Sequence, residues 1–198
     1  MGDMLAFLLA GAVCAAAPQA SPAAASGPAD ARSAEAIAAQ ADALRLQGKQ
    51  DEAAQAYLQA LEIMDQVLPP DDMRLAKALD GFSLSLEAKG WYEDAAKMGL
   101  YAARIYATVY GPRHLEVAKA AERLARLCAK DGKYAQAGAY YDQALSIREK
   151  AQGKEHKDIL PLLDEYAAML RKTPRKADIA RVEARAKTLR LKLKSAKP

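Results

Sequence analysis

Small and apolar side chains recur along most of the chain at spacings of three and four residues. One such stripe is formed by Leu79, Phe82, Ser83 and Leu86. Because an α-helix has about 3.6 residues per turn, this spacing places the side chains on one face of a helix. The pattern therefore predicts amphipathic helices, each packing against its neighbours through one apolar face.

The stripes repeat at a fixed interval, the one that separates Gly48 from Gly90 and Gly90 from Gly132. Each glycine follows one stripe and precedes another, and glycine suits the end of a helix, where the backbone leaves the right-handed conformation. Each copy is thus predicted to be two antiparallel helices joined at the glycine. The registers with this period are small (Ala41, Ser83, Ala125, Ala167; Ala60, Ala102, Ala144, Ala186) or apolar (Leu44, Leu86, Cys128, Leu170; Ile63, Ile105, Ile147, Leu189). Small residues let paired helices approach closely.

The fourth copy keeps the period but is more polar. Pro174 stands at the glycine position, and Lys187 replaces the apolar residues of the earlier copies. A terminal unit of a stacked array has one side in water, so polar replacements are expected there. The sequence predicts an all-α array of about four helix pairs. The repeats are expected at about 34–75, 76–117, 118–159 and 160–195.

The repeat resembles the tetratricopeptide repeats. The residues that carry the resemblance in the first copy are Ala41, Leu44, Gly48, Ala53, Tyr57, Ala60 and Leu61, and those in the third are Ala125, Cys128, Gly132, Ala137, Tyr141, Ala144 and Leu145. The junction motif Gly111-Pro112-Arg113-His114, repeated as Gly153-Lys154-Glu155-His156, and the long period are similar to those of kinesin light chains and their bacterial relatives. This resemblance, over about residues 34–190, implies a right-handed superhelical solenoid with a concave groove that binds protein segments.

The resemblance also implies which polar residues face that groove, because the first helix of each pair lines it in this family. The positions expected to contact a ligand are Asp42, Lys77, Asp80, Glu87, Lys119, Arg123 and Arg126. Lys119 and Arg123 match residues with which family members clamp a peptide carboxylate. The other clamp positions hold Ala38, Asp42 and Gly81, which disfavours a carboxylate-clamp co-chaperone. Lys119 and Arg123 remain able to hold an acidic ligand, and a solvated charged helix face is the alternative.

The N-terminal segment, residues 1–32, differs in composition from the repeats. Residues 4–17 form an uncharged run that is too short to span a bilayer and resembles the core of a secretory signal. We therefore expect a signal peptide in residues 1–20, an Ala/Pro-rich linker in 21–32 and a folded array from near Ser33, residues 33–195. This predicts a periplasmic or secreted protein. The lack of Lys or Arg before the run leaves a cytoplasmic location as the alternative.

The net charge of +4 conceals a strong asymmetry. Residues 171–198 carry 11 Lys or Arg and 2 Asp or Glu, whereas residues 1–170 have a net charge of −5. The members of this basic tail that we consider as binding residues are Arg175, Lys176, Arg181, Arg185, Arg190, Lys192 and Lys194. We interpret the tail as a polar cap, because Leu189 keeps the repeat register. The alternative is an anionic envelope surface or polyanion binding to residues 171–197. Nucleic acid is disfavoured because no aromatic residue follows Tyr166.

No catalytic or cofactor motif is present: there is no phosphate-binding glycine loop, Gly-x-Ser-x-Gly, His-Glu-x-x-His or Cys-x-x-Cys. His114 and His156 occupy equivalent positions of separate repeats, so they are expected at helix starts rather than on one zinc ion. Cys128 lies on an apolar stripe, as a buried thiol would. The sequence predicts no enzyme, no cofactor and no metal site, but a scaffold that binds a protein or peptide in an exported compartment.

Overall fold

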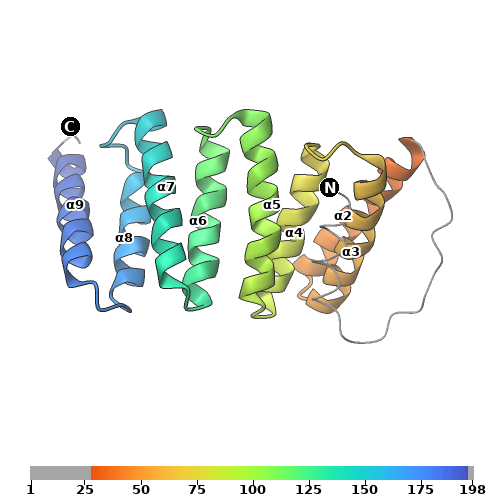
Figure 1. The fold of residues 1–198 in the computed structure, drawn as a ribbon, viewed down its shortest axis with the longest axis horizontal. Helices are drawn as coiled ribbons and strands as arrows, with labels where there is room; N and C mark the ends of the chain where they lie inside the picture. Colours follow the sequence, from red (N-terminus) through yellow and green to blue (C-terminus); the bar gives the residue numbers. More distant parts are fainter. Residues whose placement is uncertain (1–27, 196–198) are drawn as a thin grey trace. The chain divides into compact units, whose positions relative to one another are not determined.

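The computed structural model describes residues 28–195, which form eight α-helices and no strand (Figure 1). The helices are α2 (Pro28–Leu46), α3 (Gln50–Val67), α4 (Met73–Ala88), α5 (Tyr92–Tyr110), α6 (Leu115–Lys130), α7 (Tyr134–Gln152), α8 (Ile159–Leu170) and α9 (Lys176–Ser195). The predicted all-α class is thereby confirmed for the described residues. The expected signal peptide lies outside them.

The first described helix begins at Pro28 rather than near Ser33. Proline is favoured in the first turn of a helix because its missing N–H would have no intrahelical partner there. Asp30 also lies in the first turn, where a carboxylate interacts favourably with the helix dipole. These two residues extend the helix into the segment expected to be a linker.

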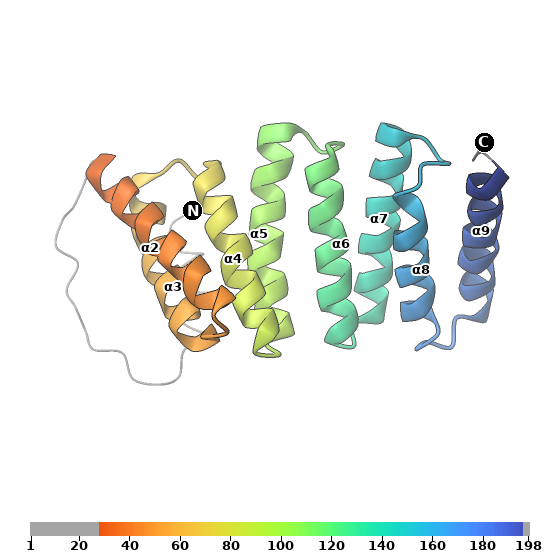
Figure 2. The ribbon, with the colours of Figure 1, turned by 180° about the vertical axis from the view of Figure 1, so that it is seen from behind.

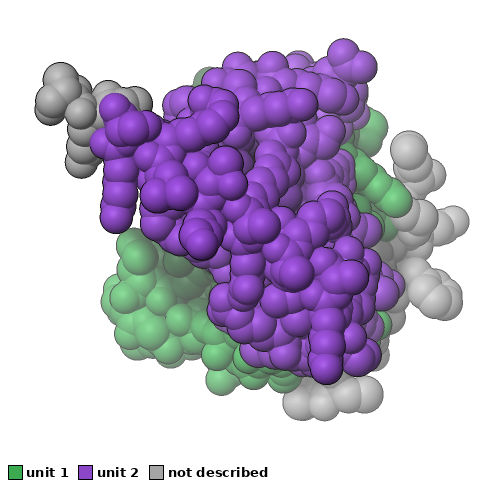
Figure 3. Space-filling model, turned by 90° about the vertical axis from the view of Figure 1, so that its left-hand side faces the viewer, with its two compact units in different colours: residues 1–105 green, residues 106–198 purple. Residues whose placement is uncertain are grey.

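The chain divides into two compact units, residues 1–105 and 106–198 (Figure 3). In the first unit α2 packs on α3 and α3 on α4, and in the second α6, α7, α8 and α9 pack in succession. Consecutive helices run in opposite directions within each unit (Figure 2). The predicted helix pairs are therefore α2–α3, α4–α5, α6–α7 and α8–α9.

The three repeat glycines end the first helix of their pairs, as the sequence predicts. Gly48, Gly90 and Gly132 have φ values of 80°, 80° and 77°, in the left-handed region that disfavours other residues. At the first turn, the Gly48 and Lys49 amides donate to the carbonyls of Arg45 and Leu44, both at 3.0 Å. This paired pattern recurs at the other two glycines and satisfies carbonyls that the helix end would leave unbonded.

The fourth turn solves the same problem without glycine. The Leu170 carbonyl accepts from the Thr173 amide at 2.9 Å and from the Thr173 hydroxyl at 2.7 Å. Pro174 then follows, and α9 begins at Lys176. A hydroxyl side chain replaces part of the left-handed glycine motif, so the proline at the glycine position does not prevent the turn.

The small-residue registers lie at the helix contacts. Ala41, Ala53 and Ala60 are fully buried in the first pair, and Ala125, Ala137 and Ala144 are fully buried in the third. In the second pair the register holds Ser83, whose hydroxyl on α4 donates to the Ala95 carbonyl on α5 at 2.8 Å. A buried serine is tolerated here because its polar atom is satisfied.

Gly81 allows a second close approach, in the middle of α4. A Cβ atom at this position would lie 2.3 Å from the hydroxyl oxygen of Tyr57, which reaches over from α3. That hydroxyl donates to Asp42 on α2 at 2.5 Å. The tyrosine ring therefore occupies the space that a side chain at position 81 would need, which gives Gly81 a packing role.

We predict that Gly81→Ala destabilises the protein by about 1–3 kcal/mol, because the added methyl group overpacks the contact with Tyr57. Gly138→Ala is the matched control, another buried glycine within a helix. Its Cβ would meet its nearest side-chain atom at an ordinary 3.5 Å. That substitution should be neutral or stabilising by up to about 1 kcal/mol. Urea unfolding of both variants measures the difference, and equal effects would refute the close-contact account.

Candidate functional site

One row of basic side chains runs along the open side of α6. The α6 basic stripe consists of Lys119, Arg123, Arg126 and Lys130, at successive spacings of four, three and four residues, and none of them is buried. Lys119 pairs with Glu116 at 2.7 Å on the same helix. Arg126 reaches Glu165 on α8 at 3.1 Å. The stripe lies on the side of α6 that faces away from Ala121, Ala125 and Cys128, the buried residues in the core with α7.

The same repeat register in the first unit carries a different surface. On α2 and α4 it holds Glu35, Ala39, Asp42, Leu46, Lys77, Gly81, Leu84 and Ala88. Leu46 is 78% exposed and Leu84 is 36% exposed, so the apolar side chains are open to solvent. We call this the unit 1 first-helix face. Leu46 and Leu84 were not among the ligand-contact residues predicted from the sequence. They stand whole repeats before Lys130 and Arg126 of the α6 basic stripe, so the repeat register identifies them.

Asp42 is held in place by an internal network. Its carboxylate accepts from the Tyr57 hydroxyl at 2.5 Å and from Arg45 at 3.2 Å. Burial, followed by the hydrogen bond with Asp42, raises the pKa of Tyr57 to about 12. The hydrogen bond with Tyr57 is the main cause of a raised pKa at Arg45. The Asp42 side chain is nevertheless 55% exposed, so it presents a fixed acceptor on the unit 1 first-helix face.

A second register of acidic residues on the first helices turns toward the second helix of its own repeat. Glu122 accepts from Arg148 on α7, and Asp164 accepts from Arg190 on α9 at 2.9 Å. The two arginines hold equivalent positions of adjacent repeats, as do the two acids. The Glu122–Arg148 pair is nearly enclosed, with side chains 13% and 12% exposed, and its hydrogen bond raises the pKa of Arg148. Asp80 holds this register on α4 and is half-buried.

The structure therefore separates the seven predicted ligand-contact residues by exposure. Asp42, Lys77 and Lys119 are exposed. Those that are only partly accessible are Asp80, Glu87, Arg123 and Arg126. Glu87 shares its register with Arg171, which pairs with Glu183 on α9. The exposed members and the α6 basic stripe are the groups best placed to meet a ligand.

Most of the basic tail is paired within the protein. Ion pairs join Arg175 and Arg181 to Asp178, Arg185 to Glu149, Arg190 to Asp164, and Lys192 to Glu155. Val182, Ala186 and Leu189 are buried on the packed side of α9, whereas Lys187 is exposed. Lys176 and Lys194 are exposed and form no ion pair with any residue between 28 and 195. The tail therefore packs one apolar side against the array, while most of its arginines pair with acids.

The two histidines lie at the starts of first helices, as predicted. Nδ1 of His114 accepts from the Glu116 amide at 3.2 Å, and Nδ1 of His156 accepts from the Asp158 amide at 3.3 Å. His114 also stacks on Tyr110 with ring centroids 4.7 Å apart. Cys128 is buried, and burial raises the pKa of its thiol. His114 is the N-cap of α6. The N-cap of α8 is Asp158, so the His156 hydrogen bond lies in the turn before that helix.

Between residues 28 and 195 there is no group of three or more His, Cys, Asp or Glu placed to hold a metal ion. In the same range, no helix is both long and apolar enough to cross a bilayer.

Comparisons with known proteins place these helix pairs in context. Two family profiles, each described as a tetratricopeptide repeat, match residues 36–70 and 74–150. No curated protein matches the sequence.

Solved structures of the same fold include BtubC (BKLC) from P. vanneervenii, with a TM-score of 0.64 and 19% identity over 82% of this chain. The chain spans only 64% of that protein's length. The TPR-like repeats of a candidate kinesin light chain from Podosopora anserina match with a TM-score of 0.70 and 18% identity, over 86% of this chain and 79% of that one. The N-terminal domain of stress-induced protein-1 from C. elegans matches with a TM-score of 0.55 and 14% identity, over 72% and 98%. At these identities the likeness shows the fold.

We predict that Glu122→Gln destabilises the protein by about 2 kcal/mol, because it leaves the enclosed Arg148 guanidinium without its main partner. Glu165→Gln removes the partner of the exposed Arg126 and should cost less than about 1 kcal/mol. Chemical denaturation compares the two variants. A larger loss from Glu165→Gln would contradict the assignment of the Glu122 register to the inner side.

Proposed function

Because the chain belongs to the tetratricopeptide-repeat family, with repeats like those of kinesin light chains, we propose that it is a non-catalytic scaffold for a partner protein. The partner places a peptide or protein segment along the first helices, on the concave groove expected for this family. The binding takes place in an exported compartment.

The observation that carries this proposal is the α6 basic stripe. Four cations lie along one side of a 16-residue helix, in a unit with 21 Lys or Arg and 11 Asp or Glu. Such an excess of charge attracts acidic ligands and raises their association rate. The Lys119–Glu116 pair is exposed, and exposed pairs contribute at most about 1 kcal/mol, so a ligand carboxylate can replace Glu116 at little cost. Arg123 and Arg126 extend the contact along the helix.

The unit 1 first-helix face supports a protein partner rather than a purely ionic ligand. Leu46 and Leu84 expose apolar surface on the face that also carries the fixed carboxylate of Asp42. Apolar side chains rimmed by polar ones are typical of protein-binding surfaces. An acidic partner residue suits the α6 basic stripe of the second unit, and an apolar one suits the unit 1 first-helix face.

The alternative function, binding of an anionic envelope surface or polyanion through residues 171–197, has weaker support. Five of the seven predicted basic residues of the tail already pair with acids, four of them arginines. A polyanion would have to compete with those internal partners. We therefore place the alternative second.

Export rests on residues 1–20. Their uncharged run and the small residues at Cys14, Ala16, Ala17 and Ala20 are the features of a cleaved secretory signal. The apolar run is shorter than a membrane span requires. The scaffold is accordingly proposed to act as a periplasmic or secreted protein.

We expect the Lys119→Ala/Arg123→Ala variant to lose a partner protein that the wild-type protein retains, because the substitutions remove both cations in the first turns of the α6 basic stripe. Lys172→Ala/Lys187→Ala is the control, with the same change in charge at exposed positions outside the stripe. Cross-linked pull-down with quantitative mass spectrometry compares the three proteins at two salt concentrations. Loss of the same partner from the control would refute the stripe as the contact surface.

The export proposal predicts a mature protein without its first residues. Expression of the whole sequence in a bacterium with a secretion system should give a chain that begins between residues 15 and 21, measured by intact mass and N-terminal sequencing. A protein that keeps residues 1–20 in the cytoplasm would overturn the proposal of export and leave the binding proposal standing.

A further inference from the structure

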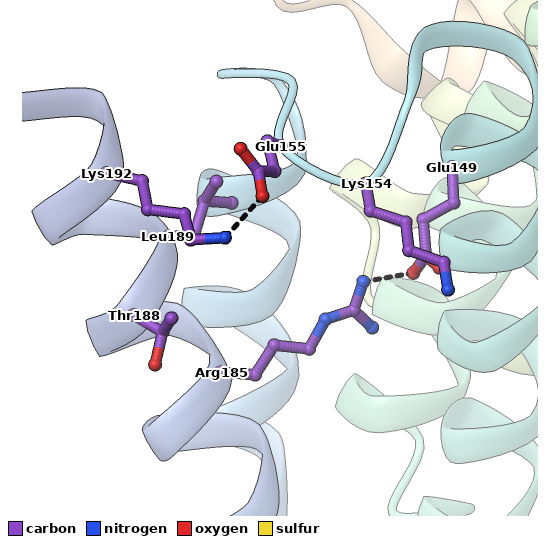
Figure 4. A pocket seen from close by; sticks show the side chains of 7 residues that line it. All are labelled: Glu149, Lys154, Glu155, Arg185, Thr188, Leu189 and Lys192. Atoms are coloured by element: carbon purple, nitrogen blue, oxygen red, sulfur yellow. Dashed lines mark hydrogen bonds and ion pairs between the residues drawn. The ribbon is translucent and has the colours of Figure 1, made fainter. Parts of the chain in front are cut away.

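A cleft with charged walls lies between the second helices of the last two repeats. Its walls come from the C-terminal half of α7, the loop before α8, and α9 (Figure 4). Two adjoining hollows of about 330 and 260 Å³ share three lining residues, Glu149, Lys154 and Arg185. The cleft belongs entirely to the second unit and is built from different helices than the α6 basic stripe.

Two ion pairs connect the walls. Arg185 on α9 pairs with Glu149 on α7, and Lys192 on α9 pairs with Glu155 in the loop (Figure 4). Glu149 is 17% exposed and Arg185 is 39% exposed, so the first pair is partly shielded from solvent. The first contact joins α9 to α7, and the second joins α9 to the loop before α8.

The cleft also contains cations that the protein does not pair. Lys150 and Lys154 line it, are exposed, and form no ion pair with any described residue. Asp142, the remaining acid in the lining, accepts a hydrogen bond from the Tyr166 hydroxyl at 3.3 Å. The two lysines are therefore available to an incoming negative group, within a unit that already has an excess of positive charge.

This charge arrangement is specific to the last junction of the second unit. At the equivalent positions one repeat earlier, Ala107, Pro112 and Gln143 stand in place of Glu149, Lys154 and Arg185. A solvated surface common to all repeats would not require such a change. The ion pairs between the walls and the two unpaired lysines therefore occur together at this junction.

We infer that this cleft is a second binding site, separate from the first helices, for an acidic segment of a partner protein. Side-chain carboxylates of the segment pair with Lys150 and Lys154. Its backbone N–H groups meet the acidic side chains in the walls, and its apolar atoms contact Leu145 and Leu189. Charge-assisted hydrogen bonds to the two lysines supply most of the recognition.

The mixed signs of the lining favour a peptide over a polyanion. Glu149, Glu155 and Asp142 would repel the closely spaced phosphates of a nucleic acid or polyphosphate. A peptide separates its carboxylates by neutral groups and backbone donors, which can face these acids. The cleft therefore favours an acidic peptide over a polyanion, whereas the net charge of the unit alone would attract both.

The test uses the full chain carrying Lys119→Ala/Arg123→Ala, which removes two of the four cations of the α6 basic stripe and so reduces its contribution to binding. Fluorescence anisotropy follows a labelled short peptide of alternating glutamate and alanine at low and near-physiological salt. Lys150→Gln/Lys154→Gln should weaken binding about tenfold. The control Lys172→Gln/Lys187→Gln removes equal charge from exposed positions outside the cleft and should change the affinity less than about twofold.

A photo-reactive version of the peptide should cross-link to residues 142–155 or 185–192. Equal weakening by both lysine pairs would overturn the proposal, because net charge alone would then explain the binding. Tighter binding of a polyphosphate of equal charge, sensitive to Lys150→Gln/Lys154→Gln, would overturn it in favour of a polyanion site. Absence of peptide binding in this background would also overturn it and would leave the proposal for the first helices intact.

Discussion

The close contact between the two helices of each pair, made through small side chains, is the constraint on which the other features depend. Ala41, Ala53 and Ala60 are fully buried, and larger residues at these positions would force α2 and α3 apart. The glycine turns fix where each pair reverses, so the small residues of both helices meet in register. Once this contact is set, every other position on the helices has a defined direction. The polar registers acquire their roles from that direction.

The acidic registers show how direction determines chemistry. Glu122 and Asp164 point toward the second helix of their repeats and meet arginines there, whereas the neighbouring α6 basic stripe contains exposed and half-buried cations. Ion pairs inside the repeat join its two helices, and we propose that the more exposed charges serve recognition. The last helix follows the same rule, since Arg185, Arg190 and Lys192 bind α9 to the helices and the loop before it. A basic sequence therefore produces a last helix whose arginines pair with acids, while several of its lysines are exposed.

The sequence predicts the helix pairs, the turns and the small-residue contacts well, because they depend on local spacing and on a repeated register. It predicts that the two histidines lie near the starts of first helices for the same reason. The role of Gly81 could not be foreseen, since the contact comes from the hydroxyl of Tyr57, which lies on another helix of the preceding repeat. The pairing of Arg185 with Glu149 likewise requires α7 and α9 to be adjacent. The exposure of Leu46 and Leu84 could have been found by extending the register of Lys119 and Arg126 to the first two repeats.

The central claim, that a partner binds along the first helices, is tested most directly by site-specific photo-cross-linking. A photo-reactive amino acid is placed in turn at Leu84, Lys130 and Lys187 in the full chain, and the cross-linked partner is identified by mass spectrometry. The account predicts that one and the same partner is captured from positions 84 and 130, on the first helices, and not from position 187 on the outer side of α9. Capture from position 187 alone would contradict it and would assign recognition to the basic tail.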